Sequence, residues 1–507
     1  MPRSFRKANG FSSVSNAREQ RRSTAMALTA RRAMVGGRGA AAVVLAGSLL
    51  LSLLTYWQHD GSSDAGTTLT TAWQMSQGKE LYRDIVDFYP PVAFTLLAGV
   101  FKIVGPSYLA AKALFLGLLI ICGLAVQRAT RDFLPPAWQY AVLPLWLVFF
   151  AFYTLINHNP LSLWLAALAW VSWSMAQRSS SRGFSFLAGL LAGAASGTLQ
   201  TKGLAVLLAA ALVVAIHQRK VWRLLLWLGG GFVAVLFLLF TIWPPALLWE
   251  LLVAVPANSY AVPPGRLEYG LITLAVAVQL VSGWQLLRQR APVVVWGWWW
   301  LGVMLLASTA VRTDAHHVVM NSFPLLPVAL WIASQRRWKK TRGMSQVLDR
   351  MLATLVVAYP LTLALLVAAA LPSGWPVAQG RTFWEWLALR NRGIEAIVFA
   401  VQTRVPPGKS IYAGPFLANA YFETQRENPT RFNNLITGLY PSAYFQEARA
   451  SLEEDTPAVV LLNYPLVAKY QHQMNNPVDA FFWSRYRVTA QFGDTVLLEL
   501  QQPSGSP

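Results

Sequence analysis

The sequence predicts an α-helical polytopic membrane protein with a small α/β domain outside the membrane at its C-terminal end. Two observations predict this fold class. Of the 507 residues, 55% are hydrophobic and only 13% are charged, whereas soluble chains carry about a quarter charged residues. The apolar residues also come in blocks of roughly 17–23, the length with which a helix crosses a bilayer.

The net charge of +20 could indicate a nucleic-acid partner, but its distribution favours a membrane. Lys and Arg gather in residues 1–32 and in alternate short loops, which is the positive-inside bias of cytoplasmic segments. We therefore expect no nucleic acid. The single cysteine, Cys122, lies in an apolar block, which excludes intramolecular disulfides and cysteine metal clusters.

The chain begins with a basic, polar segment, residues 1–32, which we expect to be a disordered cytoplasmic tail. The apolar blocks that follow predict about eleven transmembrane helices within residues 33–371, the first of them retained rather than cleaved. The charge bias places the N-terminus in the cytoplasm, loop 57–106 outside the inner (plasma) membrane, and residues 372–507 outside as well. The predicted spans are 33–56, 107–127, 137–156, 160–176, 184–200, 203–217, 222–243, 269–287, 292–310, 318–334 and 350–370.

The first outer loop concentrates acidic residues at the membrane edge. Charge beside hydrocarbon is costly, so we interpret this loop as the acidic face of an active site. Residues 65–77 predict a short helix that begins at Asp64, and 91–105 predict an interfacial helix. Asp64 could cap the helix or could be a functional carboxylate. The acidic residues of the loop are Asp60, Asp64, Glu80, Asp84 and Asp87.

The C-terminal segment, 372–507, changes in composition and predicts a small α/β domain. A hairpin turn is expected at 492–494, and helices are expected at 383–403 and 443–454. Its predicted strands are 410–412, 458–462, 488–491 and 495–500.

Lys202 and Arg312 are cations on the predicted outer side, where the charge bias disfavours them. A lysine at a helix end often only snorkels to the interface; alternatively, both cations bind an anion opposite the acidic loop. His316 and His317 follow Arg312, but adjacent residues of a helix do not share a face. A metal would need further ligands, so a divalent metal stays open and no metal ligand is assigned.

Three sets of residues resemble a known family. The first outer loop has the spacing of GT-C-fold glycosyltransferases, in the bacterial branch related to protein O-mannosyltransferases and lipid A aminoarabinose transferases. Two later segments are similar to its glycine-rich helix that ends in a lysine and to its R-x-D-x-x-H segment. The sets are Asp64-Ala-Gly66, Gly78, Tyr82-Arg83-Asp84, Asp87 and Pro90-Pro91; Gly193, Gly197 and Thr201-Lys202-Gly203; and Arg312-Thr313-Asp314 with His316 or His317.

The resemblance implies a GT-C-like transmembrane domain over 33–371, with 57–106 as the catalytic loop. It implies transfer of a sugar from a polyprenyl-phosphate carrier to an acceptor hydroxyl on a lipid, glycan or protein, with inversion. Asp64 would be the general base, and Asp60 either a partner carboxylate or a solvated loop residue. The donor phosphate would be bound by Lys202, Arg312, His316 and His317.

The resemblance further implies that a set of loop residues shapes the substrate pocket. Two positions depart from the family pattern. Tyr89 stands where many relatives have a lysine, and Asn157-His158-Asn159 stands where some have an acidic residue. The implied pocket residues are Tyr82, Arg83, Asp84, Asp87, Tyr89 and Asp314.

Three other functions stay open from the sequence: a ligase of lipid-linked glycans, a transporter or flippase, and a non-catalytic scaffold. Transporters favour ionisable residues near mid-membrane and inverted repeats. Here the charges lie at the ends of the spans, which favours transfer.

Overall fold

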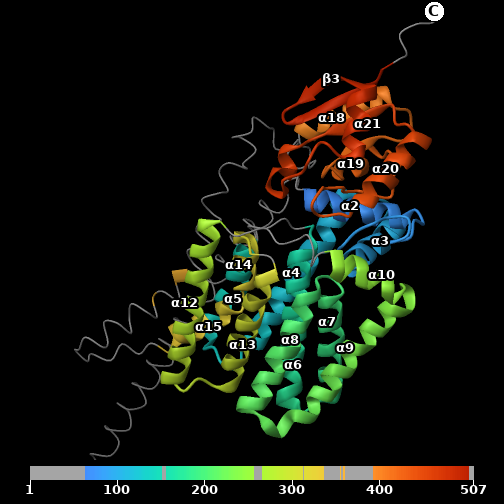
Figure 1. Ribbon diagram of the computed structural model, residues 1–507. Helices are drawn as coiled ribbons and strands as arrows, with labels where there is room; N and C mark the ends of the chain where they lie inside the picture. The colour runs from blue at the N-terminus through green and yellow to red at the C-terminus, as the bar shows by residue number, and fades with distance from the viewer. Residues whose placement is uncertain are drawn as a thin grey trace, which may run out of the picture.

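The computed structural model describes residues 63–150, 156–255, 265–311, 313–335, 354, 358–359 and 392–501. In this part of the chain, a bundle of helices carries an α/β domain at one end (Figure 1). The N-terminal tail, the first predicted span, Asp60, Arg312 and nearly all of 336–391 lie outside the described residues.

The helical part begins with two short helices in the segment that the sequence predicts as the first outer loop. Helix α2 (Ser63–Ser76) packs on α3 (Val92–Val104) and on the C-terminal domain. The bundle then follows the chain closely, with α7 packed against α6, α8 and α9. Its elements are α4 (Tyr108–Thr130), α5 (Pro136–Phe150), α6 (His158–Ser179), α7 (Arg182–Ser196), α8 (Gln200–His217), η1 (Arg219–Val221), α9 (Trp222–Ile242), α10 (Pro245–Trp249), η2 (Glu250–Ala254), α12 (Arg266–Arg288), α13 (Val293–Ala307), η3 (Ser308–Val311), α14 (Ala315–Asn321) and α15 (Leu325–Ser334).

Five helices of the described residues are long and apolar enough to cross a membrane, so the predicted number of about eleven is not established. One predicted span, 318–334, is two helices, α14 and α15. Pro324 lies at their junction, and a proline lacks the N–H that would continue the helix. The five are Tyr108–Thr130, Gln200–His217, Arg219–Ile242, Arg266–Arg288 and Val293–Ala310.

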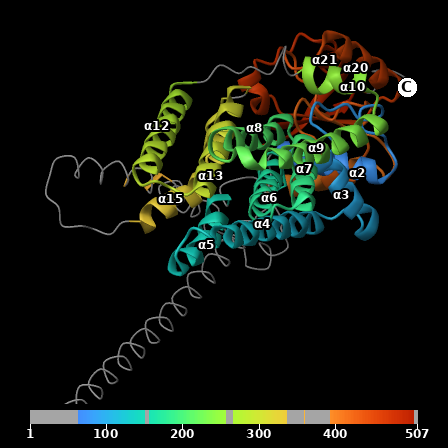
Figure 2. The same ribbon diagram turned by 90° about the horizontal axis from the view of Figure 1, so that it is seen from below.

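The bundle core is rich in buried tryptophan side chains. Helices α12, α13 and α15 form the flank of the bundle that lies away from α2 and α3 (Figures 1 and 2). Where α13 meets α6, Trp298 and Trp170 pack edge to face with ring centroids 6.5 Å apart. Such packing adds to the stabilisation that burial itself provides.

The C-terminal domain is a four-stranded sheet of order β1-β2-β4-β3 with surrounding helices. Strands β1 and β2 are parallel, and β4 is antiparallel to both β2 and β3. The hairpin predicted at 492–494 is present, with Gly493 at a positive φ of 59°, a conformation that glycine adopts readily. The elements are α18 (Arg392–Arg404), β1 (Tyr412–Gly414), α19 (Asn419–Thr424), α20 (Ser442–Glu454), β2 (Val459–Leu462), η5 (Pro465–Tyr470), α21 (Pro477–Arg485), β3 (Tyr486–Phe492) and β4 (Thr495–Leu500).

Candidate active site

Asp64 lies in the first turn of α2 as described from Ser63 onward, and is therefore inside the helix and not before it. Its Oδ2 accepts a hydrogen bond of 3.3 Å from the side-chain Nδ2 of Asn157. This partner belongs to the start of α6, 93 residues away. The carboxylate that the sequence predicts as the base therefore joins two segments of the membrane domain.

The amide orientation of Asn157 follows from its backbone contacts. Its Oδ1 accepts the backbone N–H of Asn159 at 2.8 Å and the Asn159 Nδ2 at 3.2 Å. A backbone N–H can only donate, so the Asn157 nitrogen must face Asp64. The Asn159 amide is oriented in turn, and its Oδ1 lies 3.1 Å from His317 Nε2.

His317 completes a row of hydrogen-bonded side chains. Asp314 caps α14: its Oδ1 accepts the backbone N–H of His317 at 3.0 Å and lies 2.7 Å from the ring Nδ1. Both ring nitrogens therefore face oxygen atoms. Because the Asn159 nitrogen is used by Asn157, its oxygen accepts from His317 Nε2. We call Asp64, Asn157, Asn159, His317 and Asp314 the polar row.

The polar row contains three of the predicted site residues and two that the sequence analysis noted only as a departure. His316, next to His317, is exposed. Asp60 and Arg312 lie outside the described residues, so their positions stay predictions.

The C-terminal domain holds α2 on its other side. A Cβ atom at Gly66 would lie 2.6 Å from the backbone nitrogen of Asn419, so only glycine permits this approach. One helical turn further, Thr70 donates to the carbonyl of Ala418 at 2.6 Å. Asp64 is thus on a helix whose position depends on the domain above it.

Amide side chains from the 433–434 segment add to this contact. Asn433 and Gln74 exchange two hydrogen bonds, of 2.7 and 3.2 Å, and Asn434 donates to Thr67 at 2.8 Å. All four side chains are buried. Buried polar groups are costly unless paired, so these contacts determine how α2 docks against the domain.

The loop after α2 is organised around Tyr89. Its carbonyl accepts the hydroxyl of Tyr82 at 2.8 Å, and its N–H donates to Asp87 Oδ1 at 3.1 Å. Its ring lies against His158, with centroids 3.7 Å apart. The tyrosine at the position of the missing lysine thus connects the first outer loop to the start of α6.

Asp87 is buried, and its Oδ2 has no hydrogen-bond partner among the described residues. Burial raises the pKa of this carboxyl to about 7, although the N–H groups of Tyr89 and Phe88 oppose the shift; the charge of Asp64 adds to it. Asp87 therefore changes charge near neutral pH beside the polar row.

Arg83 and Asp84 lie on the outer surface of the same loop. Arg83 Nε pairs with Asp84 Oδ1 at 3.0 Å, and the Arg83 side chain is 67% exposed. Hydrogen bonds from Arg83 and from the backbone of Glu80 hold the pKa of Asp84 below its usual range. Their side-chain contacts are local, although the carbonyl of Arg83 accepts from Arg431 at 3.3 Å, and a substrate role for them stays a prediction.

Lys202 is a buried cation in the first turn of α8, with 3% of its surface exposed. Its Nζ donates to the hydroxyl of Ser308 at 2.8 Å, and it has no carboxylate partner among the described residues. A buried charge normally has an opposite charge beside it. Among the described residues, Lys202 therefore lacks the opposite charge that an anion would supply, and its burial is not the arrangement of a snorkelling side chain.

The Lys202 turn adjoins the first outer loop. The backbone N–H of Val92, directly after the Pro90-Pro91 pair, donates to the carbonyl of Gly197 at 2.8 Å. Residues 197–199 separate α7 from α8, so Lys202 begins the second helix instead of ending the glycine-rich one. This end of the bundle lies under α2 and the C-terminal domain (Figure 1).

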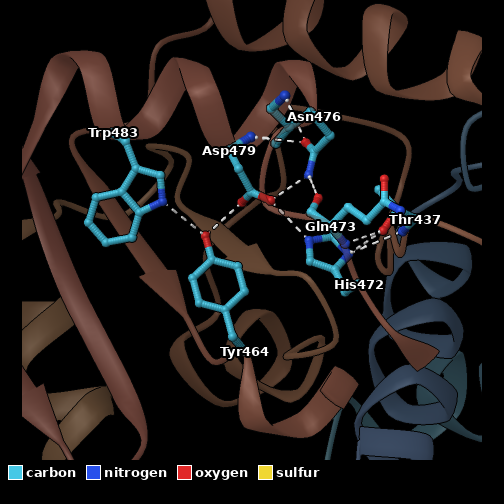
Figure 3. A network of polar contacts seen from close by, with 8 residues as sticks. Thr437, Tyr464, His472, Gln473, Asn476, Asp479 and Trp483 are labelled. Atoms are coloured by element: carbon cyan, nitrogen blue, oxygen red, sulfur yellow. Dashed lines mark hydrogen bonds and ion pairs between the residues drawn. The ribbon is translucent and has the colours of Figure 1, made fainter. Parts of the chain in front are cut away.

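A second polar cluster, which the sequence analysis missed, lies within the C-terminal domain (Figure 3). His472 Nδ1 accepts the backbone N–H of Thr437 at 3.1 Å, so its Nε2 donates to Asp479 at 2.9 Å. Asp479 also accepts the hydroxyl of Tyr464 at 2.7 Å. Because the histidine nitrogens and the carboxylate are satisfied internally, the cluster anchors the loop at 437, which follows the segment bonded to α2.

Among the residues that the structure describes, no group of three or more His, Cys, Asp or Glu side chains could hold a metal ion. Asp314 and His317 are already bonded to each other. We therefore assign no metal ligand.

No family model matches this chain, and no curated protein matches it. Its structure is similar to crystal structures of ArnT from Cupriavidus metallidurans. The form bound to undecaprenyl phosphate has 12% identity and a TM-score of 0.58, covering 92% of this chain and 99% of that one. For the apo form the TM-score is 0.60 and the identity 12%, with 91% and 98% covered. The apo oligosaccharyltransferase of Archaeoglobus fulgidus has 12% identity and a TM-score of 0.47, covering 92% of this chain and 75% of that one. The chain therefore has the fold of ArnT, which confirms the GT-C-like fold that the motifs of the sequence predict.

Proposed function

We propose that this protein is a membrane glycosyltransferase that moves a sugar from a polyprenyl-phosphate carrier to an acceptor hydroxyl. The observation that carries the proposal is Lys202, a buried ammonium whose partner is a neutral hydroxyl. An anionic phosphate would supply the missing opposite charge. The likeness to ArnT, crystallised with undecaprenyl phosphate, supports a polyprenyl carrier.

In this proposal, Lys202 binds the donor phosphate and stabilises the negative charge that grows on it as the sugar leaves. Ser308 holds the ammonium in place through the 2.8 Å hydrogen bond. A preorganised donor at a leaving group is among the most effective catalytic devices. We expect Arg312 to contribute a second cation.

Asp64 acts as the general base. It takes the proton from the acceptor hydroxyl as that oxygen attacks the anomeric carbon, and the bond from that carbon to the phosphate oxygen breaks. The carrier phosphate departs as an anion, the anomeric centre inverts, and no covalent enzyme intermediate forms. Asn157 orients the base by donating to one of its oxygens, which leaves the other for the acceptor.

The rest of the polar row keeps Asn157 in this orientation. His317 donates to Asn159, whose amide donates to Asn157. The acceptor hydroxyl belongs to a lipid, a glycan or a protein. In this proposal the site faces outward, the orientation that the charge pattern of the loops predicts.

The test uses Asp64→Asn in full-length protein reconstituted into liposomes with a polyprenyl-phosphate sugar. We expect normal insertion and melting temperature and a loss of transfer of at least 100-fold, the scale of a lost general base. Glu80→Gln, an exposed carboxylate of the same loop, is the matched control and should keep its activity. Transfer by Asp64→Asn within about threefold of the wild type would show that the base is another group.

A further inference from the structure

A cavity of about 460 Å³ lies at the end of the bundle opposite the C-terminal domain. It is formed where the junction between α6 and α7 meets the junction between α8 and α9, both at the lower end of Figure 1. Nothing in the proposed transfer reaction uses this region. Its lining is Ser180, Arg182, Lys220, Val221, Trp222, Arg223, Leu224, Leu226 and Trp227.

Three of the lining residues are cations, Arg182, Lys220 and Arg223, and none has a carboxylate partner among the described residues. The two guanidinium groups lie over indole rings, Arg182 over Trp227 at 5.9 Å and Arg223 over Trp222 at 5.8 Å. Stacking on an aromatic face holds a guanidinium in place while its N–H groups remain available. The cavity therefore presents positive charge that no acidic side chain neutralises.

Two helix dipoles add to the positive electrostatic potential of the cavity. Helix α7 begins at Arg182 and α9 begins at Trp222, so the positive ends of two long helices meet at the cavity. Ser181 caps α7 through Phe184, whereas α9 has no side-chain cap. The N–H of Trp222 donates to the carbonyl of Arg219 in the preceding 3-10 turn, so at α9 the anion is favoured by the helix dipole and not by a free N–H group.

The wall of the cavity continues into an apolar surface. In the apolar segment Arg219–Ile242, only 17% of the residues are buried, and Phe237 is 69% exposed. Leu226 lines the cavity, and Val233 and Phe237 follow on the exposed side of the same helix. A ligand seated here would have an anionic group beside the three cations and hydrocarbon along α9.

We propose that this cavity binds the phosphate headgroup of an anionic phospholipid, with the acyl chains lying along α9. Basic pockets between transmembrane helices are suited to such headgroups. A soluble phosphate would use the cations but not the adjoining apolar face, so the structure favours the lipid. The charge pattern predicts this end to be cytoplasmic.

The test is binding of phosphatidylglycerol to the full-length protein in neutral detergent, measured by native mass spectrometry and by the melting temperature. Phosphatidylcholine and inorganic phosphate are titrated in parallel arms. We expect phosphatidylglycerol to bind and to raise the melting temperature, and the other two to have little effect. The triple variant Arg182→Gln/Lys220→Gln/Arg223→Gln should lose affinity on the order of 100-fold, from typical contributions of basic residues near anionic lipid.

The matched control is Arg131→Gln/Arg288→Gln/Arg290→Gln, which removes the same charge at the same end but outside the cavity. It should bind phosphatidylglycerol within about threefold of the wild type. If the first triple variant does not fold, Lys220→Gln alone should weaken binding about fivefold. Equal binding of both lipids, equal loss in both triple variants, or equal stabilisation by inorganic phosphate would overturn the proposal.

Discussion

Replacement of Lys202 by methionine should lower the transfer activity without lowering the melting temperature. A lysine that only stabilises the fold would give the opposite result. Methionine keeps the length and apolar character of the side chain but removes its charge. In the protein without substrate, the ammonium is buried against a single hydroxyl, that of Ser308. Removal of an uncompensated buried charge is commonly neutral or stabilising, so Lys202→Met should melt at the same or a higher temperature.

The effect on transfer should be large and of opposite sign. An ammonium about 4 Å from a phosphate charge contributes about 4 kcal/mol at an effective dielectric constant near 20. Removal of a single preorganised donor in other enzymes costs roughly 100- to 1,000-fold in rate, which is consistent with this figure at about 1.4 kcal/mol per tenfold. We therefore expect kcat/KM for the donor to fall by about 100- to 1,000-fold.

The assay is initial-rate transfer in liposomes with donor and acceptor varied in turn, beside a thermal melt. The control is Lys102→Met. Lys102 is an exposed cation on α3, so this variant also removes one positive charge, but away from Lys202. Lys202→Met should weaken donor use far more than acceptor use. An equal effect on both substrates, or activity within about threefold of the wild type, would refute a role in phosphate binding.

Two further predictions concern the first outer loop. The pKa of Asp87 is raised to about 7, so the folded chain keeps a proton that the unfolded chain loses near pH 4, and stability falls as the pH rises between these values. Asp87→Asn should remove this fall, on the order of 4 kcal/mol; melts between pH 4 and 8 that keep the slope would contradict it. Gly66→Ala forces a Cβ to within 2.5 Å of Asn419, and such overpacking costs roughly 1–3 kcal/mol. Melting temperature and transfer should both fall, whereas Gly99→Ala, with open space around it, should not destabilise; equal melts would contradict the contact.

The helices of this protein could be predicted because length and hydropathy identify them locally. The predicted span 107–127 corresponds to α4, Tyr108–Thr130, and 443–454 corresponds to α20, Ser442–Glu454. Two further local signals in the sequence mark element boundaries. Pro324 divides the span predicted at 318–334, and Asn476-Pro477 is a helix start that predicts α21.

The contacts that build the candidate site could not be predicted in the same way. Gln74 and Asn433 are 359 residues apart, and Lys202 and Ser308 are 106 apart. The sequence around either residue does not identify its partner, because any buried amide or hydroxyl could complete the hydrogen bond. The resemblances of the first loop and of the glycine-rich segment point to Asp64 and Lys202, respectively, but not to the residues that hold them in place.

The Asn157-His158-Asn159 segment shows how a departure from a family pattern can be compatible with the same chemistry. An aspartate at 157 would place a second carboxylate 3.3 Å from Asp64, and two such charges cannot both ionise without a cation between them. Asparagine donates instead, because its oxygen is occupied by the N–H of Asn159. The amide therefore donates to Asp64 without placing a second carboxylate beside it. Asn157→Asp should therefore impair transfer more than Asn157→Ala. The alanine only removes a hydrogen-bond donor to Asp64, whereas the aspartate would compete with Asp64 for the proton of the acceptor hydroxyl.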